Sequence, residues 1–224
     1  MSSPGALTRS DLERLPRTPL REPSALKPSV WRVETAGGPL VVKDVRTSGR
    51  TTRWIARWLM GRERRVLERL APLEGVPHLE AVVDADAIAL TCLPGRTLDA
   101  ETFARRPREL AGQLAELTGR LHALGVFHLD LHQRKNLLVD DGGRLHLVDF
   151  GAALAPGPVV RTLLGPLLRA VDRQAATKYL ARFAPDALTE EEARAVLRQR
   201  ALRRLWPFSR PSRREGEAAR RRLG

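Results

Sequence analysis

Two short polar segments in the second half of the chain contain the residue types most suited to chemistry. They are His128–Asn136, with the sequence HLDLHQRKN, and Leu147–Gly151, with the sequence LVDFG. Their Asp and Asn side chains offer carboxylate and amide oxygens, which are hard ligands. No Cys and His spacing in the chain suggests a zinc site. The two segments are therefore the candidate functional site.

A strand-rich part of the chain precedes these segments. Residues 30–35 alternate as a strand does, residues 36–38 indicate a tight turn, and residues 40–45 indicate the partner strand. Residues 62–70 are helical in character and stop before Pro72. Two further strand-like runs, 79–83 and 87–93, end at Pro94 and Gly95.

The part that follows is mostly helical. Leucines at positions 110, 114, 117, 121 and 124 recur at steps of three and four, and Gly125 is the expected C-terminal cap. Residues 140–143 predict a hairpin turn between the two polar segments. Two more helices are expected at about 162–183 and 190–205, the second opening with a capping box of Thr189 and Glu192.

This order predicts an α+β fold with a small strand-rich lobe and a helical lobe. We expect an irregular, proline-rich segment over residues 1–28 and a first lobe over 29–95. The helical lobe is expected over 96–208, and a basic, disordered tail over 209–224.

The two polar segments resemble the catalytic loop (H-x-D…N) and the D-F-G motif of the protein-kinase-like superfamily. The resemblance extends outward in the same chain order and covers about residues 30–205. Val41-Val-Lys43 is similar to the strand that supplies the kinase lysine. Glu63 opens a stretch similar to the helix that supplies this lysine's ion-pair partner, and Leu90–Gly95 resembles the hinge between the lobes.

The resemblance implies a kinase-like phosphotransferase that uses ATP and Mg²⁺. Transfer of a γ-phosphoryl group needs positioned charge and an oriented acceptor hydroxyl more than covalent help. His128 is expected to hold the loop, and Gly151 to allow the backbone turn after the metal-binding Asp. The implied catalytic residues are Asp130, Lys43, Glu63 and His128; the nucleotide contacts are Lys43, Leu90, Cys92, Asn136 and Asp149; the Mg²⁺ ligands are Asp149 and Asn136.

The chain departs from the family pattern at several positions. Five residues separate Asp130 from Asn136, where four are usual, so the loop must bulge by one residue. No G-x-G-x-x-G precedes Lys43; the phosphate-covering loop would fall near residues 20–29. His132 stands where protein kinases usually have lysine, and Arg134 or Lys135 could supply that charge. Both of the first two departures leave room for a catalytically inactive pseudokinase.

The segment after Gly151 is minimal. Residues 152–161 contain no Ser, Thr or Tyr and no A-P-E, and Leu129 replaces the arginine that reads a phosphorylated activation loop. These features resemble the atypical branch: RIO kinases, aminoglycoside-type phosphotransferases and bacterial lipopolysaccharide core (Kdo/heptose) kinases. The short length favours the RIO-like and lipopolysaccharide-kinase-like groups. The implied acceptor is a sugar hydroxyl of a lipid-linked core, or alternatively a protein Ser or Thr.

Composition limits the location and the partners. The net charge is +13, nearly all of it from arginine, which favours polyanions, although high genomic GC content enriches arginine as well. One cysteine, no signal-peptide core and no apolar stretch of membrane-spanning length predict a cytoplasmic protein. We expect a monomer, and no recognition motif for nucleic acid is present.

A basic, tryptophan-containing segment, residues 50–60, allows two interpretations. Trp54 and Trp58 share one side of a helical wheel and arginines share the other, which is typical of contact with an anionic membrane at the inner face of the inner membrane. The alternative is a helix that packs its tryptophans on the small lobe. His122 and His146 are expected to be a surface helix residue and a strand residue rather than ligands.

Overall fold

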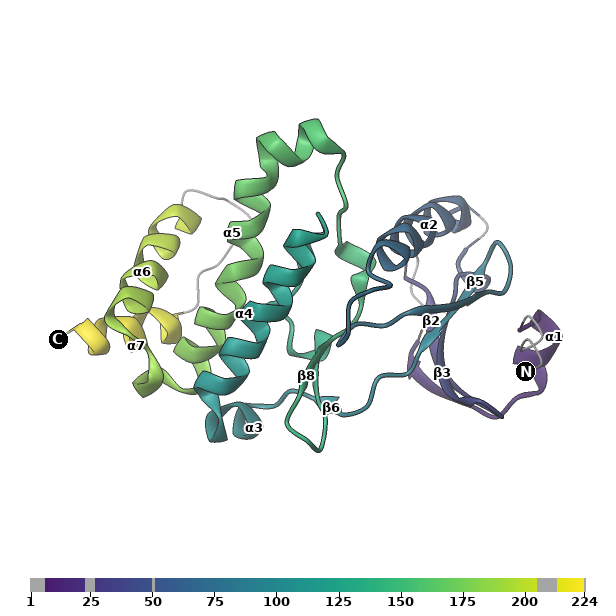
Figure 1. The fold of residues 1–224 in the computed structure, drawn as a ribbon, viewed down its shortest axis with the longest axis horizontal. Helices are drawn as coiled ribbons and strands as arrows, with labels where there is room; N and C mark the ends of the chain where they lie inside the picture. Colours follow the sequence, from purple (N-terminus) through teal and green to yellow (C-terminus); the bar gives the residue numbers. More distant parts are fainter. Residues whose placement is uncertain (1–6, 23–26, 50, 205–212, 224) are drawn as a thin grey trace. The chain divides into compact units, whose positions relative to one another are not determined.

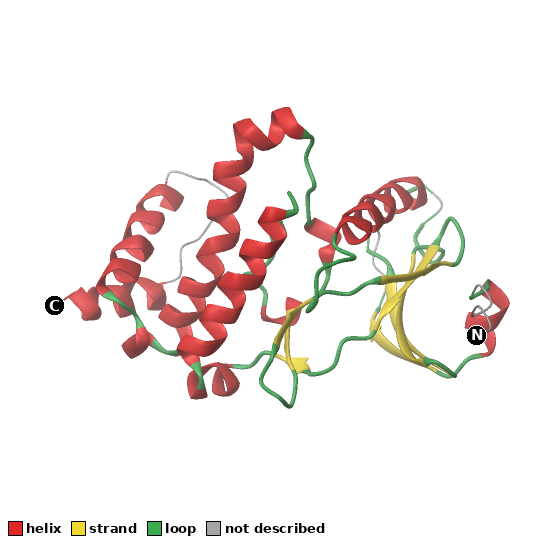
Figure 2. Cartoon of the chain, in the orientation of Figure 1, coloured by secondary structure: helices red, strands yellow, loops and turns green. Residues whose placement is uncertain are grey.

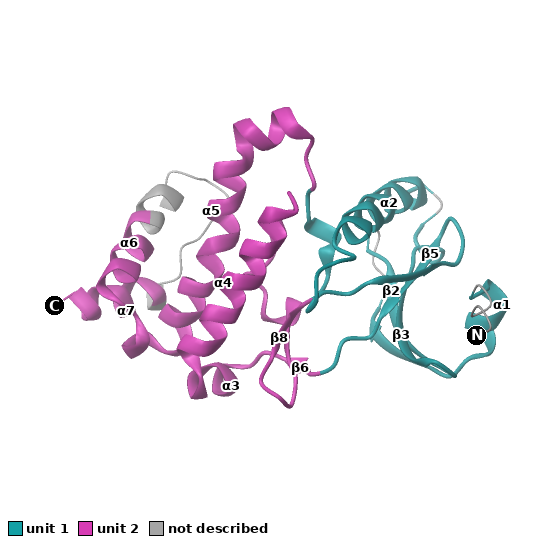
Figure 3. Ribbon diagram, viewed as in Figure 1, with its two compact units in different colours: residues 1–94, 148–154 teal, residues 95–147, 155–224 magenta. Residues whose placement is uncertain are grey.

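The computed structural model describes residues 7–22, 27–49, 51–204 and 213–223. The chain divides into two compact units (Figure 3). Unit 1 contains residues 1–94 together with 148–154, and unit 2 contains residues 95–147 and 155–224. Each unit is described below by itself. Unit 1 is rich in strands and unit 2 in helices (Figure 2), so the predicted α+β class is confirmed.

Unit 1 is built on an antiparallel five-stranded sheet with the strand order β1-β2-β3-β5-β4. The hairpin of β2 and β3 turns at Gly38, whose φ of 112° is a conformation that favours glycine. Strand β3 is central, with β2 and β5 as neighbours (Figure 1). The strands are β1 Arg17–Arg21, β2 Ser29–Thr35, β3 Gly38–Asp44, β4 Leu79–Val82 and β5 Ala87–Thr91.

Helix α2, Arg53–Arg69, is one continuous helix that joins the basic segment to the helix expected from residue 62. Its buried residues recur at helical spacing and include Ala56, Met60 and Glu63. Trp54 is 69% exposed and Trp58 is 58% exposed. The packing of these tryptophans on the small lobe is therefore the wrong interpretation, since their rings lie outside the buried stripe.

The N-terminal segment is ordered where we expected irregular structure. Helix α1, Arg9–Arg14, opens with a capping box between Thr8 and Asp11, and strand β1 pairs with β2. Leu12 of α1 packs into a core cluster with side chains of β2, β3 and β5. The prolines of this segment had indicated irregular structure. Pro19 is compatible with a strand here because β1 lies at the edge of the sheet. Residues 1–6 and 23–26 lie outside the described residues.

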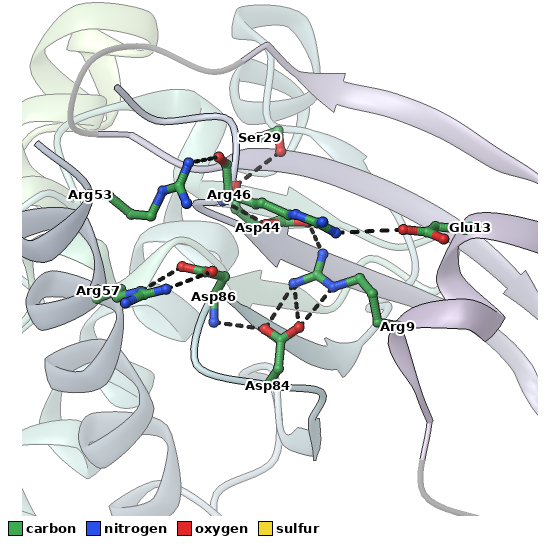
Figure 4. Close-up of polar contacts among 9 residues, drawn as sticks. All are labelled: Arg9, Glu13, Ser29, Asp44, Arg46, Arg53, Arg57, Asp84 and Asp86. Carbon is green, nitrogen blue, oxygen red and sulfur yellow. Dashed lines mark hydrogen bonds and ion pairs between the residues drawn. The ribbon is translucent and has the colours of Figure 1, made fainter. Parts of the chain in front are cut away.

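Ion pairs fasten α1 to the end of the sheet (Figure 4). Arg9 contacts Asp44 at the end of β3, and its Nε and terminal nitrogen donate to the two oxygens of Asp84, each at 2.8 Å. Arg57 of α2 makes a second two-point contact, with Asp86 at 2.7 and 2.9 Å. Both helices are thus tied to the β4–β5 turn through arginine–carboxylate pairs.

Unit 2 contains a short three-stranded sheet, β6-β7-β8, and a set of helices. Helix α4 buries the predicted leucine stripe, and Gly125 after it has a φ of 71°, as expected of a C-terminal cap. The predicted capping box at Thr189 and Glu192 is present. The elements are β6 Arg96–Thr97, β7 Leu137–Val139, β8 Leu145–Leu147, α3 Ala100–Arg105, α4 Pro107–Ala123, α5 Pro158–Phe183, α6 Glu190–Arg204 and α7 Arg213–Leu223.

The basic tail also contains a helix where we expected disorder. Helix α7 buries Ala218 and Ala219, and Nε of Arg222 donates to the carbonyl of Leu188 at 2.7 Å. Two adjacent alanines give the helix a narrow face that packs on α5 and α6, and Arg220, Arg221 and Arg222 are exposed. Residues 205–212 and 224 lie outside the described residues.

Two further features concern the surface. Only residues 153–157 separate the short 3-10 turn Phe150–Ala152 from α5, as the minimal segment after Gly151 predicts. The first half of α5 has an exposed apolar stripe that includes Val159 and Leu163, each 73% exposed. Within the described part of the chain, no helix has the length and apolarity that crossing a membrane requires.

Candidate active site

The centre of unit 1 is a buried ion pair between β3 and α2. Alternation along β3 directs Val42 into the cluster under α1 and Lys43 toward α2. Lys43 Nζ lies 2.5 Å from Glu63 Oε1, and both side chains are about 95% buried. Burial by itself lowers the pKa of Lys43, but the carboxylates of Glu63 and Asp149 outweigh it and raise the pKa. Lys43 is therefore a fixed positive charge.

Asp149 presents a carboxylate next to this lysine. Its Oδ1 lies 3.2 Å from Lys43 Nζ, and its Oδ2 lies 2.9 Å from a guanidinium nitrogen of Arg21. Burial raises the pKa of Asp149, but Lys43 and Arg21 outweigh burial and hold the pKa well below its usual range. The side chain remains 27% exposed. Asp149 is thus an ionised carboxylate that solvent, or a cation, can still reach.

The backbone around Asp149 corrects the expected role of Gly151. Asp149 itself has a φ of 63°, in the left-handed region that non-glycine residues rarely adopt. A Cβ at Gly151 would lie 3.3 Å from Asp149 Oδ1, so the glycine leaves space beside the carboxylate. Arg62 of α2 donates to the carbonyl of Gly151 at 2.6 Å, which ties this segment to the helix that supplies Glu63.

Unit 2 holds the loop of residues 128–136, with Asp130 at its centre. Gln133 Nε2 lies 2.7 Å from each carboxylate oxygen of Asp130, and Asn136 Nδ2 donates to Asp130 Oδ2 at 3.0 Å. His132 Nε2 lies 3.4 Å from Asp130 Oδ1. The extra residue in the loop is accommodated by a 3-10 turn, Arg134–Asn136, closed by a bond from Asn136 N to the carbonyl of Gln133.

Asn136 has one oxygen that fits a metal ligand. Its amide nitrogen is used by Asp130, while its Oδ1 is buried and accepts no hydrogen bond from the described residues. A buried acceptor without a donor is costly unless a cation or a water satisfies it. No group of three His, Cys, Asp or Glu side chains forms a metal cage among the residues described here. The unpartnered oxygen of Asn136 fits Mg²⁺, which proteins often bind through a few protein oxygens together with substrate phosphates.

Side chains of α5 hold the loop of residues 128–136 through hydrogen bonds to its backbone. Asp172 is 98% buried and accepts hydrogen bonds from the backbone nitrogens of His128 at 2.9 Å and Leu129 at 2.7 Å. His122 Nε2 lies 3.0 Å from the same carboxylate. Leu129 has a φ of 64°, so Asp172 supports a strained backbone position directly before Asp130. The hydroxyl of Tyr179 donates to the carbonyl of Leu131 at 3.0 Å.

Three of these positioning residues were missed by sequence reasoning. Asp172 and Tyr179 lie in a helix with no motif of its own, and each has a charged residue directly beside it, so neither is distinguished by the local pattern. Arg21 has no sequence signal apart from its place before the β1–β2 connection. His122 was expected at the surface and is buried, because the α4 stripe continues to its position. His146 is a strand residue as expected; it is buried, and its Nε2 lies 3.2 Å from Asp140 Oδ2.

The two residues of the predicted hinge that were assigned to the nucleotide both lie in unit 1, whereas Gly95 at the end of that hinge begins unit 2. Leu90 is 98% buried in β5, opposite Val41. Cys92 follows β5 as a partly buried free thiol, and burial raises its pKa. The structure thus brings Lys43, Glu63 and Asp149 together in unit 1, and His128, Asp130 and Asn136 together in unit 2.

Comparisons with known proteins agree with this arrangement. The Phosphotransferase enzyme family matches residues 21–126, which include Lys43 and Glu63 and end before Asp130. This match covers less than half of the chain, and it agrees with the resemblance of the motifs to the protein-kinase-like superfamily. Two similar curated proteins are kinases by name. They are CBL-interacting protein kinase 22 of Oryza sativa subsp. japonica, 36% identical over 39% of this chain, and testis-specific serine/threonine-protein kinase 5 of Mus musculus, 39% identical over 39% of this chain.

The matched regions are partial. The alignments cover 22% of the rice protein and 20% of the mouse protein, so the chain spans about a fifth of the length of the curated relatives it matches.

Proposed function

We propose that this chain is an ATP- and Mg²⁺-dependent phosphotransferase that moves a γ-phosphoryl group to a hydroxyl. The observation that carries the proposal is the buried Lys43–Glu63 pair with Asp149 beside it. A lysine held charged by two carboxylates is costly to bury, and a phosphate-binding role gives it a use. The match to the Phosphotransferase enzyme family over this region supports the same conclusion.

Each residue has a role in this proposal. Lys43 binds the α- and β-phosphates while Glu63 fixes its direction, and Asp149 and Asn136 supply oxygens to magnesium. Bound magnesium would neutralise charge on the phosphate oxygens. Asp130 orients the acceptor hydroxyl and accepts its proton; His128 and Asp172 hold the loop that carries Asp130. Leu90 and Cys92 contact the base of the nucleotide.

The acceptor we propose is a sugar hydroxyl of a bacterial lipopolysaccharide core or of another lipid-linked glycan. Two exposed apolar surfaces support peripheral contact with an anionic membrane. One is the pair Trp54 and Trp58 on α2, where Arg62 stacks over the ring of Trp58. The other is the α5 stripe, whose residues Val159, Leu163 and Leu167 lie on the side of the helix away from the buried Asp172.

A RIO-like protein serine/threonine kinase is the second candidate, because both curated relatives are named as protein kinases. The third is a pseudokinase that binds polyanions or partners through its basic surface. The absence of a glycine-rich loop before Lys43 favours it. The two enzyme candidates differ in the acceptor, and the third differs from both in transferring no phosphate.

A transfer assay separates these candidates. Radiolabelled ATP and Mg²⁺ are incubated with the protein and with core lipopolysaccharide in anionic vesicles, its lipid A precursor, or a generic protein mixture. We expect label on core lipopolysaccharide, and a loss of roughly a hundredfold or more in rate for Asp130→Asn, with ATP binding retained. Label on protein Ser or Thr alone would favour the RIO-like reading. An unchanged rate in Asp130→Asn would refute the role of Asp130.

A further inference from the structure

A pocket within unit 2 adjoins the loop that carries Asp130. It has a volume of about 520 Å³ and is lined by residues 97–99, residues 132–135 and Arg182 of α5. We refer to it as the loop pocket. Gln133 lines this pocket and also donates to both carboxylate oxygens of Asp130 at 2.7 Å. A molecule in the loop pocket is therefore one side chain away from Asp130.

The loop pocket is strongly basic. Arg134, Lys135 and Arg182 line it, against a single carboxylate, Asp99. None of these three cations forms an ion pair with a residue in the described ranges. Asp99 is already engaged as the N-cap of α3, where it accepts a hydrogen bond from Thr102 N at 2.7 Å. Arg134 helps to lower the pKa of Asp99, so the walls offset part of the positive charge, and three cations against one carboxylate leave the pocket with a net positive charge.

The two arginines of the pocket share an aromatic neighbour. The guanidinium of Arg134 lies 5.6 Å, and that of Arg182 5.4 Å, from the centre of the same ring, Phe183. Like charges that line one pocket repel each other, and an anion bound in the pocket offsets that repulsion. Guanidinium groups bind phosphate and carboxylate groups through paired hydrogen bonds, and Thr97 adds a hydroxyl to the pocket wall.

We propose that the loop pocket binds an oxyanion group, phosphate or carboxylate, on the acceptor, and so selects anionic sugars over polycationic ones. This inference rests on the proposed phosphotransfer and adds the substrate class. It also assigns Arg134 and Lys135 to the acceptor, whereas the sequence alone suggested a place near the γ-phosphate. Arg182 is a specificity-determining residue that no motif indicated.

The test measures binding without catalysis, so that its failure is separate from a failure of the transfer assay. Mannose 6-phosphate, glucuronate and glucosamine are titrated into the 224-residue chain and followed by saturation-transfer NMR and calorimetry. The variants are Arg182→Gln combined with Lys135→Gln, and Arg120→Gln as a matched control. Arg120 is an exposed arginine of α4 in the same unit, and it does not line the pocket.

We expect mannose 6-phosphate, glucuronate or both to bind, and glucosamine not to bind. The double variant should bind the anionic sugar roughly tenfold or more weakly, while Arg120→Gln should leave the affinity unchanged. Binding of the phosphate sugar alone assigns phosphate as the recognised group, and binding of both assigns any oxyanion. Equal affinity in wild type and double variant, equal binding of glucosamine, or displacement of the sugar by Mg-ATP would each overturn the proposal.

Discussion

At the scale of single residues, the account depends on charges kept in place by burial. Lys43 and Glu63 form a pair with little access to solvent, and Asp149 joins it from a strained backbone position. Removing one member of such a group leaves an uncompensated charge in the interior, which costs more than the pair gains. The arrangement is therefore easier to explain as a binding site than as a source of stability.

The depressed pKa of Asp149 predicts a specific pH dependence of stability. Because its folded-state pKa lies below the unfolded value of about 3.9, the ionised carboxylate stabilises the fold above that value and the contribution is lost as pH falls. Lys43 has a raised pKa, so its contribution is complete below about 10.4 and stays constant in acid. The free energy of unfolding should thus respond to acid through Asp149.

We expect the difference in free energy of unfolding between wild type and Asp149→Asn to become about 1 kcal/mol smaller when the pH is lowered from 5 to 3. Urea unfolding at several pH values measures it. Glu80→Gln is the control, since Glu80 is an exposed residue of β4 in the same unit. If the free energy of unfolding fell equally with acid in wild type and in Asp149→Asn, the result would contradict the ion pairs at Asp149.

The site residues that could be predicted are those that stand in a local sequence motif. Lys43, Asp130 and Asp149 each stand in a short motif, and the order of the motifs along the chain identified them together. Asp172 acts through the backbone of His128 and Leu129, 43 or more positions away. Such a contact depends on how α5 packs, which no local pattern in the sequence encodes.

At the scale of elements, the short helices were the hardest to predict. A helix of six residues, such as α1, gains too little from its own hydrogen bonds to form alone. It is stabilised by Leu12 in the sheet cluster and by Arg9 on Asp44 and Asp84. The longer helix α4 was predictable because its leucine periodicity extends over about four turns. The contact of Gly95 with Val139 was also beyond prediction, because the two residues are far apart in the sequence. The backbones approach so closely that a Cβ at Gly95 would lie 2.5 Å from the carbonyl oxygen of Val139.

Leu12→Ala should therefore destabilise unit 1. Leu12 is 4% exposed, and removing three carbons from this cluster should lower the free energy of unfolding by about 2–3 kcal/mol. Urea unfolding measures the change. Leu20→Ala is the matched control, because Leu20 on β1 is 56% exposed and should lose little. Equal losses in the two variants would mean that α1 does not dock on the sheet.

At the scale of the whole molecule, the net charge is +13, and its positive side chains are of two kinds. Arg9, Arg57 and Arg62 are engaged in ion pairs or backbone contacts, so their charge serves the fold. The cations of the loop pocket are not so engaged, and these are the ones for which a ligand is proposed. The α+β class followed from the order of strand-like and helical segments, whereas the proposed acceptor depends on features that only the folded units reveal.

Binding of Mg-ATP tests the central claim most directly. Isothermal titration of ATP, with and without Mg²⁺, into wild type and Asp149→Asn compares the two proteins at neutral pH. The account predicts magnesium-dependent binding by wild type and a loss of roughly tenfold or more in affinity in the variant. Equal affinities in the two proteins, or a folded wild type that binds no Mg-ATP, would contradict it.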